Sequence, residues 1–144
     1  MRVMKTFRPS DKDIDRKWWI ADADGQTLGR FAVKVTGLLY GKDKPCFSRD
    51  VDTGDFVVVV NAAKIRVTGK KAVQKEYFRY SGYPRGAKYV SYREMHENHP
   101  DRIISHAVSG MLPKNLLRAK ILKRLKVYAG PEHVHSAQKP EPVK

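Results

Sequence analysis

The sequence predicts an α/β fold, a three-layer α/β/α domain around a mainly parallel sheet of about four strands, with basic loops and a C-terminal tail. The strongest observation is the run Phe56–Val60, which is continuously apolar and mostly β-branched. Such a strand is buried on both faces and requires a layer above and below it. A strand pattern at 18–23 and a helical pattern at 28–39 precede it. Together these segments predict a βαβ unit with a right-handed crossover.

The length and composition fit one folded domain. The chain has 144 residues, of which 41% are hydrophobic and 10% aromatic. No internal repeat or linker divides it. We therefore expect a single domain over 1–144, made of a polar lead-in (1–17), an α/β core (18–130) and an extended tail (131–144).

The helix that follows the first strand is the clearest element. Thr27 suits the N-cap position, and apolar residues then recur at the spacing of one helical face until Gly41 ends the helix. We expect this helix to pack on the central strand through Phe31, Val35 and Leu38.

Shorter elements are expected after the central strand. In chain order they are an extended piece at 65–67, a strand at 75–80, a loop at 81–86, a helix capped by Ser91, a helix from Pro100 to Gly110, a helix at 114–123 and a strand at 125–129. In the helix at 114–123, the residues expected to carry its apolar face are Leu116, Leu117, Ile121 and Leu122.

The charge is strongly positive and unevenly distributed. Lys and Arg number 29 against 15 Asp and Glu, which gives a net charge of +14 and a pI of about 10.0. Through Asp55 there are nine acids and eleven bases, whereas the remainder has six acids and eighteen bases. A merely solvated helix face normally contains interspersed Glu, but no acid occurs from Arg102 to Pro131. We therefore favour a face that binds a polyanion such as a nucleic acid.

The cations of the second part of the chain form two basic blocks, one between Phe56 and Arg93 and one between Arg102 and Pro131. Aromatic residues interleave with the first of these blocks. Rings offer stacking surfaces to unpaired bases, and cations contact phosphates. Tyr77 or Phe78 is expected to be buried if 75–80 is a strand, whereas Tyr80 and Tyr83 are expected to contact bases. The residues predicted to bind RNA are Lys70, Lys71, Arg79, Tyr80, Tyr83, Arg85, Lys88, Lys114, Arg118, Lys120, Lys123, Arg124 and Lys126. Without RNA, the basic loop 69–88 and the tail 132–144 are expected to be mobile.

Catalytic and metal sites are not expected. The stretch 67–71 lacks the first glycine and the Ser or Thr of a phosphate-binding P-loop, so no nucleotide cofactor is predicted. His133 and His135 supply too few ligands for zinc. Asp50, Asp52 and Asp55 are explained as turn formers before the central strand.

The sequence fits two other classes of protein less well, an enzyme and a membrane-surface protein. An enzyme with a small-molecule site at the carboxyl ends of the strands needs a convergent acid and base, which the sequence does not show. A membrane-surface protein is disfavoured because the cations do not lie on one long amphipathic helix.

The compartment is predicted from what the sequence lacks. The single cysteine, Cys46, excludes an internal disulfide and favours a reducing compartment, where it is expected to be a small buried thiol. No apolar run approaches the ~20 residues of a membrane span, and the first residues do not resemble a signal peptide. We expect a soluble cytoplasmic protein.

Several motifs resemble the bacterial form of the L13 family of large-subunit ribosomal proteins. The resemblance runs from Trp18 to Pro140, through the segments 27–30, 51–56, 61–64, 67–69, 110–114, 125–130, 132–133 and 135–138. It implies an α/β/α fold without enzymatic activity, binding to large-subunit ribosomal RNA beside neighbouring ribosomal proteins, a role in early subunit assembly, and a cytoplasmic location in the large ribosomal subunit.

One short segment departs from this family. After Pro113 and Lys114 the family usually has a glycine and then a Gly-Arg pair, whereas this chain continues Asn-Leu-Leu-Arg-Ala. The family arginine falls on Ala119, and Arg118 lies one position earlier, which turns a helical side chain by about 100°. Asn115 is expected to adopt the left-handed conformation that glycine would take.

Overall fold

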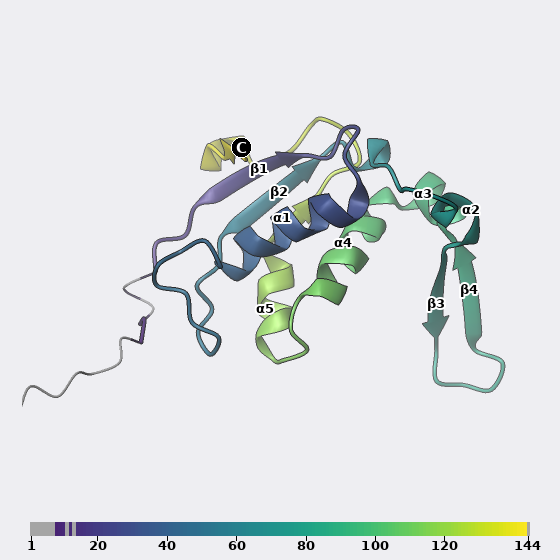
Figure 1. Ribbon diagram of the computed structural model, residues 1–144, viewed down its shortest axis with the longest axis horizontal. Helices are drawn as coiled ribbons and strands as arrows, with labels where there is room; N and C mark the ends of the chain where they lie inside the picture. The colour runs from purple at the N-terminus through teal and green to yellow at the C-terminus, as the bar shows by residue number, and fades with distance from the viewer. Residues whose placement is uncertain (1–7, 11, 13, 144) are drawn as a thin grey trace, which may run out of the picture.

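The structure is a computed structural model and describes residues 8–10, 12 and 14–143 (Figure 1). Its elements are β1 (Trp18–Asp22), α1 (Leu28–Tyr40), β2 (Phe56–Val60), the 3-10 helix η2 (Ala62–Lys64), α2 (Lys71–Gln74), β3 (Glu76–Tyr80), β4 (Ala87–Ser91), α3 (Tyr92–Asn98), α4 (Pro100–Met111), α5 (Leu117–Lys123), β5 (Leu125–Val127), the 3-10 helix η3 (Ser136–Gln138) and β6 (Glu141–Pro142). None of the helices in these residues is long and apolar enough to span a bilayer.

The main sheet has four parallel strands in the order β5-β2-β1-β6. The predicted interior strand is confirmed, because β2 lies between β1 and β5, with Val58 opposite Ile20 on one side and Lys126 on the other. The fourth strand is β6, which comes from the tail, and the Val143 amide donates a hydrogen bond to the Ile20 carbonyl at 2.9 Å.

Helices lie on both sides of this sheet, as predicted (Figure 1). On one side α1, α4 and α5 enclose the core, in which Phe31, Ile103 and Ile104 are buried with Val57 and Val59 of β2. Neighbouring residues of a strand face opposite sides, so Val58 and Val60 face the other layer.

The second layer is small and comes from the tail. Trp18 stacks on Phe56 with ring centroids 4.4 Å apart, and the His135 ring lies 5.2 Å from Trp18. The Tyr128 hydroxyl and His135 Nε2 are 3.1 Å apart, which fixes the segment that carries η3. The tail therefore has a packing role instead of lying free on the surface.

Helix α1 ends where its sequence predicts. Gly41 adopts a left-handed conformation, with φ of 75°, and its amide donates to the carbonyls of Gly37 and Leu38. Phe31, Val35 and Leu39 are buried, and Leu38 is half-buried. Helix α3 also begins as predicted, because the Ser91 hydroxyl accepts a hydrogen bond from the Glu94 amide at 3.2 Å.

The segment expected to be a basic loop forms a hairpin beside the short helix α2. Strand β3 pairs antiparallel with β4, outside the main sheet. The strand at Ala87–Ser91 was not predicted, because it is short and directly follows turn residues around Gly86, so its alternation of polar and apolar side chains was not recognised. In Figure 1 the hairpin projects from the body of the domain at the end where α2 and α3 lie.

Helix α5 begins three residues later than expected. Asn115 is not left-handed: among the described non-glycine residues, positive φ occurs at Asn61, Arg85 and Lys139. The Asn115 side-chain oxygen instead accepts a hydrogen bond from the Arg118 amide at 3.1 Å and so caps the first turn. Leu116 therefore precedes the helix and is 93% exposed, so its predicted place on the apolar face was wrong.

A buried ion pair joins the start of β2 to the junction between α5 and β5. The Arg124 guanidinium donates to both carboxylate oxygens of Asp52, at 2.6 and 2.5 Å, and to the Leu39 carbonyl at 3.2 Å. Gly54 packs so closely here that a Cβ atom would overlap the Leu39 carbonyl. This contact fixes three segments at one point: the end of α1, the loop before β2 and the end of α5.

Asp55 makes a second anchor in the same loop. Its buried carboxylate accepts hydrogen bonds from Trp19 Nε1 at 2.9 Å and from the Lys17 amide at 3.0 Å, and it pairs with Lys44 at 2.5 Å. The explanation of Asp52 and Asp55 as turn formers was therefore incomplete, because both bind residues distant in sequence.

The first prediction tests the interior strand. Val58 is fully buried, so Val58→Lys places an unpaired ammonium in the core. We expect a loss of several kcal/mol from a free energy of unfolding of about 5–15 kcal/mol, measured by denaturant unfolding. The matched control is Val33→Lys on α1, where the side chain is 61% exposed and the change should stay within about 0.5 kcal/mol. A cooperative Val58→Lys variant as stable as Val33→Lys contradicts the assignment.

The second prediction tests the Asp52–Arg124 pair. Asp52→Asn keeps the shape of the side chain but leaves the buried guanidinium without a counter-charge, so it should cost about 3 kcal/mol in thermal or denaturant unfolding. Asp24→Asn is the control, because Asp24 pairs with Lys64 on the surface and should contribute less than about 1 kcal/mol. Equal stability of the two variants would show that the pair does not anchor the fold.

Candidate nucleic-acid interface

The predicted RNA-binding residues lie in three places. Lys70 and Lys71 are exposed where α2 begins. Arg79, Tyr80, Tyr83, Arg85 and Lys88 belong to the β3–β4 hairpin. The other six lie around α5: Lys114 in the loop before it, Arg118, Lys120 and Lys123 in the helix, Arg124 directly after it and Lys126 in β5. The structure therefore keeps the two basic blocks of the sequence as separate parts of the surface.

The hairpin separates aromatic from cationic side chains. Arg79 lies opposite Lys88, and Phe78 lies opposite Tyr89. Because side chains alternate along a strand, Arg79 and Lys88 share one face, whereas Phe78, Tyr80 and Tyr89 share the other. The rings of Phe78 and Tyr80 are nearly parallel, with an interplanar angle of 12° and centroids 6.4 Å apart. Tyr80 therefore does not act beside Arg79 in one mixed surface, although the two are neighbours in sequence.

Phe78 and Tyr89 are surface rings that the sequence analysis did not assign to the interface. Both are exposed, and their centroids are 5.2 Å apart. Of the two rings considered for burial, Tyr77 is the one that packs against the core. The alternation of side chains along Glu76–Tyr80 indicates that Tyr77 and Phe78 face opposite sides. Which side is buried follows only once the partner strand β4 is known.

The tip of the hairpin presents Tyr83 and Arg85. Both side chains are exposed, and Gly82 and Arg85 have positive φ, at 86° and 63°. The Gly86 amide donates to the Tyr83 carbonyl at 2.9 Å, which closes the turn. A compact turn thus carries one ring and one guanidinium at the most distant part of the hairpin.

Helix α5 presents its cations outward and its apolar residues inward. Ile121 is buried and Leu117 is half-buried, whereas Lys120 and Lys123 are exposed and three residues apart on the helix. Lys114 is exposed in the preceding loop, and Arg118 is half-buried.

The prediction that Arg124 binds RNA was wrong. Its side chain is 8% exposed and is held by Asp52 and by the Leu39 carbonyl, so it is not available to a phosphate. Lys126 is half-buried in β5. The partner of Arg124 lies 72 positions earlier in the chain, which is why the run of cations around it gave no indication of burial.

The remaining predicted cations have no acidic partner in the described part of the chain. The ion pairs there involve Arg8, Lys44, Lys64, Arg93 and Arg124. None involves Lys70, Lys71, Arg79, Arg85, Lys88, Lys114, Arg118, Lys120, Lys123 or Lys126. Most of these cations are exposed and free to bind a polyanion.

Backbone groups cover part of the edge formed by the carboxyl ends of the parallel strands. The amides of Asn61, Ala62 and Ala63 donate to the carbonyls of Gly130, Tyr128 and Ala129, so backbone from the tail side occupies this edge. Asp22 accepts from the Asn61 side-chain amide at 2.8 Å, and this hydrogen bond is the main cause that lowers the pKa of Asp22 below its ordinary value. A carboxylate held ionised in this way is poorly suited to be a general base.

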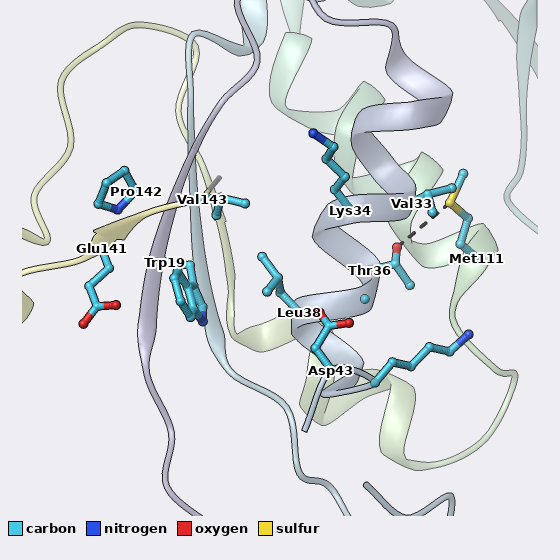
Figure 2. A pocket seen from close by; sticks show the side chains of 12 residues that line it. Trp19, Val33, Lys34, Thr36, Leu38, Asp43, Met111, Glu141, Pro142 and Val143 are labelled. Atoms are coloured by element: carbon cyan, nitrogen blue, oxygen red, sulfur yellow. Dashed lines mark hydrogen bonds between the residues drawn. The ribbon is translucent and has the colours of Figure 1, made fainter. Parts of the chain in front are cut away.

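A large groove lies between α1 and β6 (Figure 2). It has a volume of about 1110 Å³ and is lined by apolar side chains such as Val33, Met111 and Val143. Figure 2 shows Lys34 and Asp43 among the residues around it, on the side of α1. None of the predicted RNA-binding residues lines this groove, so it is separate from the basic surface.

The histidines near the C-terminus have structural partners. The His135 amide donates to His133 Nδ1 at 3.2 Å, and His135 Nε2 lies beside the Tyr128 hydroxyl. Within residues 8–10, 12 and 14–143, no three His, Cys, Asp or Glu side chains are grouped so that they could hold a metal ion.

Comparison with known proteins shows the family of this chain. The family model described as ribosomal protein L13 matches residues 16–134. Three proteins named large ribosomal subunit protein uL13 are similar over nearly their whole length. The one from Thermus thermophilus is 56% identical over 96% of this chain and 97% of its own length, and the one from Aquifex aeolicus is 54% identical over 97% of both. The one from Symbiobacterium thermophilum is 52% identical over 96% of this chain and 97% of its own length. The chain therefore belongs to the ribosomal protein L13 family, a family of structural and non-enzymatic ribosomal components.

Proposed function

We propose that this protein is a structural constituent of the large ribosomal subunit that binds large-subunit ribosomal RNA and supports early subunit assembly, and thereby translation in the cytoplasm. The names of its relatives support the large subunit as its location. The observation that carries RNA binding is the set of exposed cations without acidic partners on the hairpin, at α2 and around α5.

The α/β core serves in this proposal as a rigid support for two separate contacts. The hairpin projects at one end of the domain, and α5 packs beside α4 beneath the sheet (Figure 1). Cations at two such places neutralise phosphates of different RNA segments and hold them at a fixed spacing. Phosphate contacts position RNA without reading its sequence, so the choice of site depends on RNA shape and on a few stacked bases.

The two contacts differ in chemistry. Lys120 and Lys123 have no aromatic side chain beside them in α5 and are assigned to phosphates. Tyr83 lies exposed at the hairpin tip beside Arg85 and is assigned to stacking on an unpaired base. Arg118 lies half-buried in the first turn of α5, which supports phosphate contact by Lys114 and Lys120 more strongly than by Arg118.

The location is tested by sedimentation. A tagged copy expressed in a bacterial lysate should travel with the large ribosomal subunit on a sucrose gradient and remain with it after a moderate salt wash. A control protein of similar size and charge without this fold should leave in the wash. Recovery of the tagged protein among free proteins, with none on the large subunit, contradicts the proposed function.

The phosphate contacts are tested by a salt series. Each cation that contacts a phosphate contributes about −0.7 to −0.9 to the slope of log affinity against log salt, because binding releases counterions. Replacing Lys120 and Lys123 by Gln should therefore flatten the slope by about 1.4–1.8 in filter-binding assays with a large-subunit rRNA transcript. The control replaces Lys64 and Arg93, which are paired with Asp24 and Glu97, and should change the slope less.

Tyr83→Ala provides the contrasting result in the same assay. Loss of a stacked ring should weaken binding by roughly 1–3 kcal/mol and leave the salt slope nearly unchanged. Tyr83→Phe keeps the ring and should bind almost normally. A Tyr83→Ala variant with normal affinity removes the stacking assignment, and equal slopes for the wild type and the double lysine variant remove the phosphate assignment.

A further inference from the structure

A cleft lies between the hairpin and the helices α3 and α4. It has a volume of about 740 Å³ and is lined by Tyr77 and Arg79 of β3, Glu94 of α3, and Arg102 and His106 of α4, among others. This volume lies within the range of small-molecule sites and is sufficient for one nucleotide. Of these residues only Arg79 belongs to the predicted interface, so the cleft brings together groups that are distant in sequence.

The cleft is cationic and aromatic at the same time. Arg79 and Arg102 contribute two guanidinium groups, and neither forms an ion pair within the described part of the chain. The rings of Tyr77 and His106 lie 5.7 Å apart with an interplanar angle of 38°. Lys75 lies 5.2 Å from the centre of the Tyr77 ring, and Lys88 extends the positive charge along the hairpin opposite Arg79.

The Tyr77 hydroxyl is a buried donor without a partner. Among residues 8–10, 12 and 14–143, no group forms a hydrogen bond with its oxygen, although that atom is shielded from solvent. Burial raises the pKa of Tyr77 to about 12, so the hydroxyl retains its proton and remains a donor. A buried polar group left unsatisfied destabilises the free protein, and a ligand that reaches this oxygen when the Tyr77 side chain shifts, and accepts its hydrogen bond, removes that penalty.

The mixture of groups fits a nucleotide better than a bare anion or an apolar peptide. The guanidinium groups suit a phosphate, the rings suit a base, and the Tyr77 hydroxyl suits an acceptor on either. Glu94 adds one carboxylate to the lining, which accepts hydrogen bonds from the N–H groups of a base but repels a free phosphate.

We propose that this cleft receives a single unpaired nucleotide of the ribosomal RNA, with its phosphate on Arg79 and Arg102 and its base beside Tyr77. This inference rests on the proposed function, because the nucleotide is part of the RNA that the hairpin and α5 hold. It adds Tyr77, Glu94, Arg102 and His106 to the interface, and it assigns Arg79 to the face of the hairpin opposite the exposed rings of Tyr80 and Tyr89, with Phe78 also among the residues that line the cleft.

The decisive variant is Tyr77→Phe, because it removes only the hydroxyl. Two measurements are made: the melting temperature without RNA, and the affinity for a large-subunit rRNA transcript at fixed salt. The melting temperature should be unchanged or higher, since a buried unsatisfied donor is removed. The affinity should fall about 10-fold, the effect of losing one hydrogen bond to a charged or strongly polar group. If the cleft does not hold RNA, Tyr77→Phe leaves the affinity normal, because the hydroxyl has no partner among the described residues to lose and its removal changes nothing that the RNA contacts.

Matched controls separate the cleft from the rest of the interface. Tyr40→Phe changes a tyrosine outside the cleft and should alter neither measurement. Arg102→Gln should weaken binding and flatten the salt slope, whereas Arg93→Gln, at a residue paired with Glu97, should do so less. Ultraviolet crosslinking of the wild type should attach a nucleotide to the peptide that contains Tyr77.

The outcomes are distinguishable. If Tyr77→Phe and Arg102→Gln bind as the wild type does while the Lys120 and Lys123 variant is impaired, the cleft proposal is wrong and the proposed function stands. If the cleft variants bind rRNA normally but are lost from assembled subunits, the occupant is a protein and the proposal is also wrong. A wild-type protein that binds no rRNA overturns the proposed function and, with it, the cleft.

Discussion

The bidentate ion pair between Asp52 and Arg124 joins two parts of the chain that are 72 positions apart, and the placement of the basic surface depends on it. The guanidinium also binds the Leu39 carbonyl, and Gly54 leaves no room for a side chain beside it. The end of α1, the start of β2 and the end of α5 are therefore fixed at one point. Because Arg124 follows directly after α5, this contact sets where Lys120 and Lys123 lie relative to the sheet. Arg124 thus stabilises the fold, whereas the exposed side chains of Lys120 and Lys123 are the ones proposed to bind RNA.

The acids of the chain are used in the same way. Asp52 and Asp55 form buried ion pairs at the start of β2, while Asp22 and Asp24 hold Asn61 and Lys64 near the carboxyl end of the sheet. Through Asp55 the sequence is nearly neutral in its numbers of acids and bases, and five of its acids have polar or cationic partners within the protein: Asp22, Asp24, Asp50, Asp52 and Asp55. The second half supplies the hairpin and α5, whose cations lack such partners among the described residues. The uneven charge of the sequence therefore corresponds to a division in space. One part of the protein contains acids that are paired with its own cations, and the other is a surface whose cations an external polyanion would neutralise.

The elements that the sequence predicts well are those whose evidence is local. The apolar run of β2, the helical spacing of α1, the cap at Ser91 and the proline at the start of α4 each depend on neighbouring residues, and each was confirmed. Apart from the start of α5, where Leu116 and Asn115 were misplaced, the errors concern long-range partners. Strand β6 contains Pro142 and could not be distinguished from a tail without its partner β1. The burial of Arg124 and the division of the hairpin into two faces likewise require contacts that no local pattern contains. The cleft beside Tyr77 was unpredictable for the same reason, because its lining comes from four elements, β3, β4, α3 and α4.

The position of β6 has a consequence for the order in which the fold is completed. Strand β1 is synthesised before β2 and β5, but its outer edge is paired by residues 141–143, which follow the other strands of this sheet in the sequence. Until then β1 presents unpaired backbone groups that can recruit a strand from another molecule. The sheet therefore keeps an open edge, at which faulty association can occur, until β6 has been synthesised and has paired with β1. A variant that lacks residues 141–143 would keep its basic surface and its core helices, yet expose the edge of β1 that β6 covers.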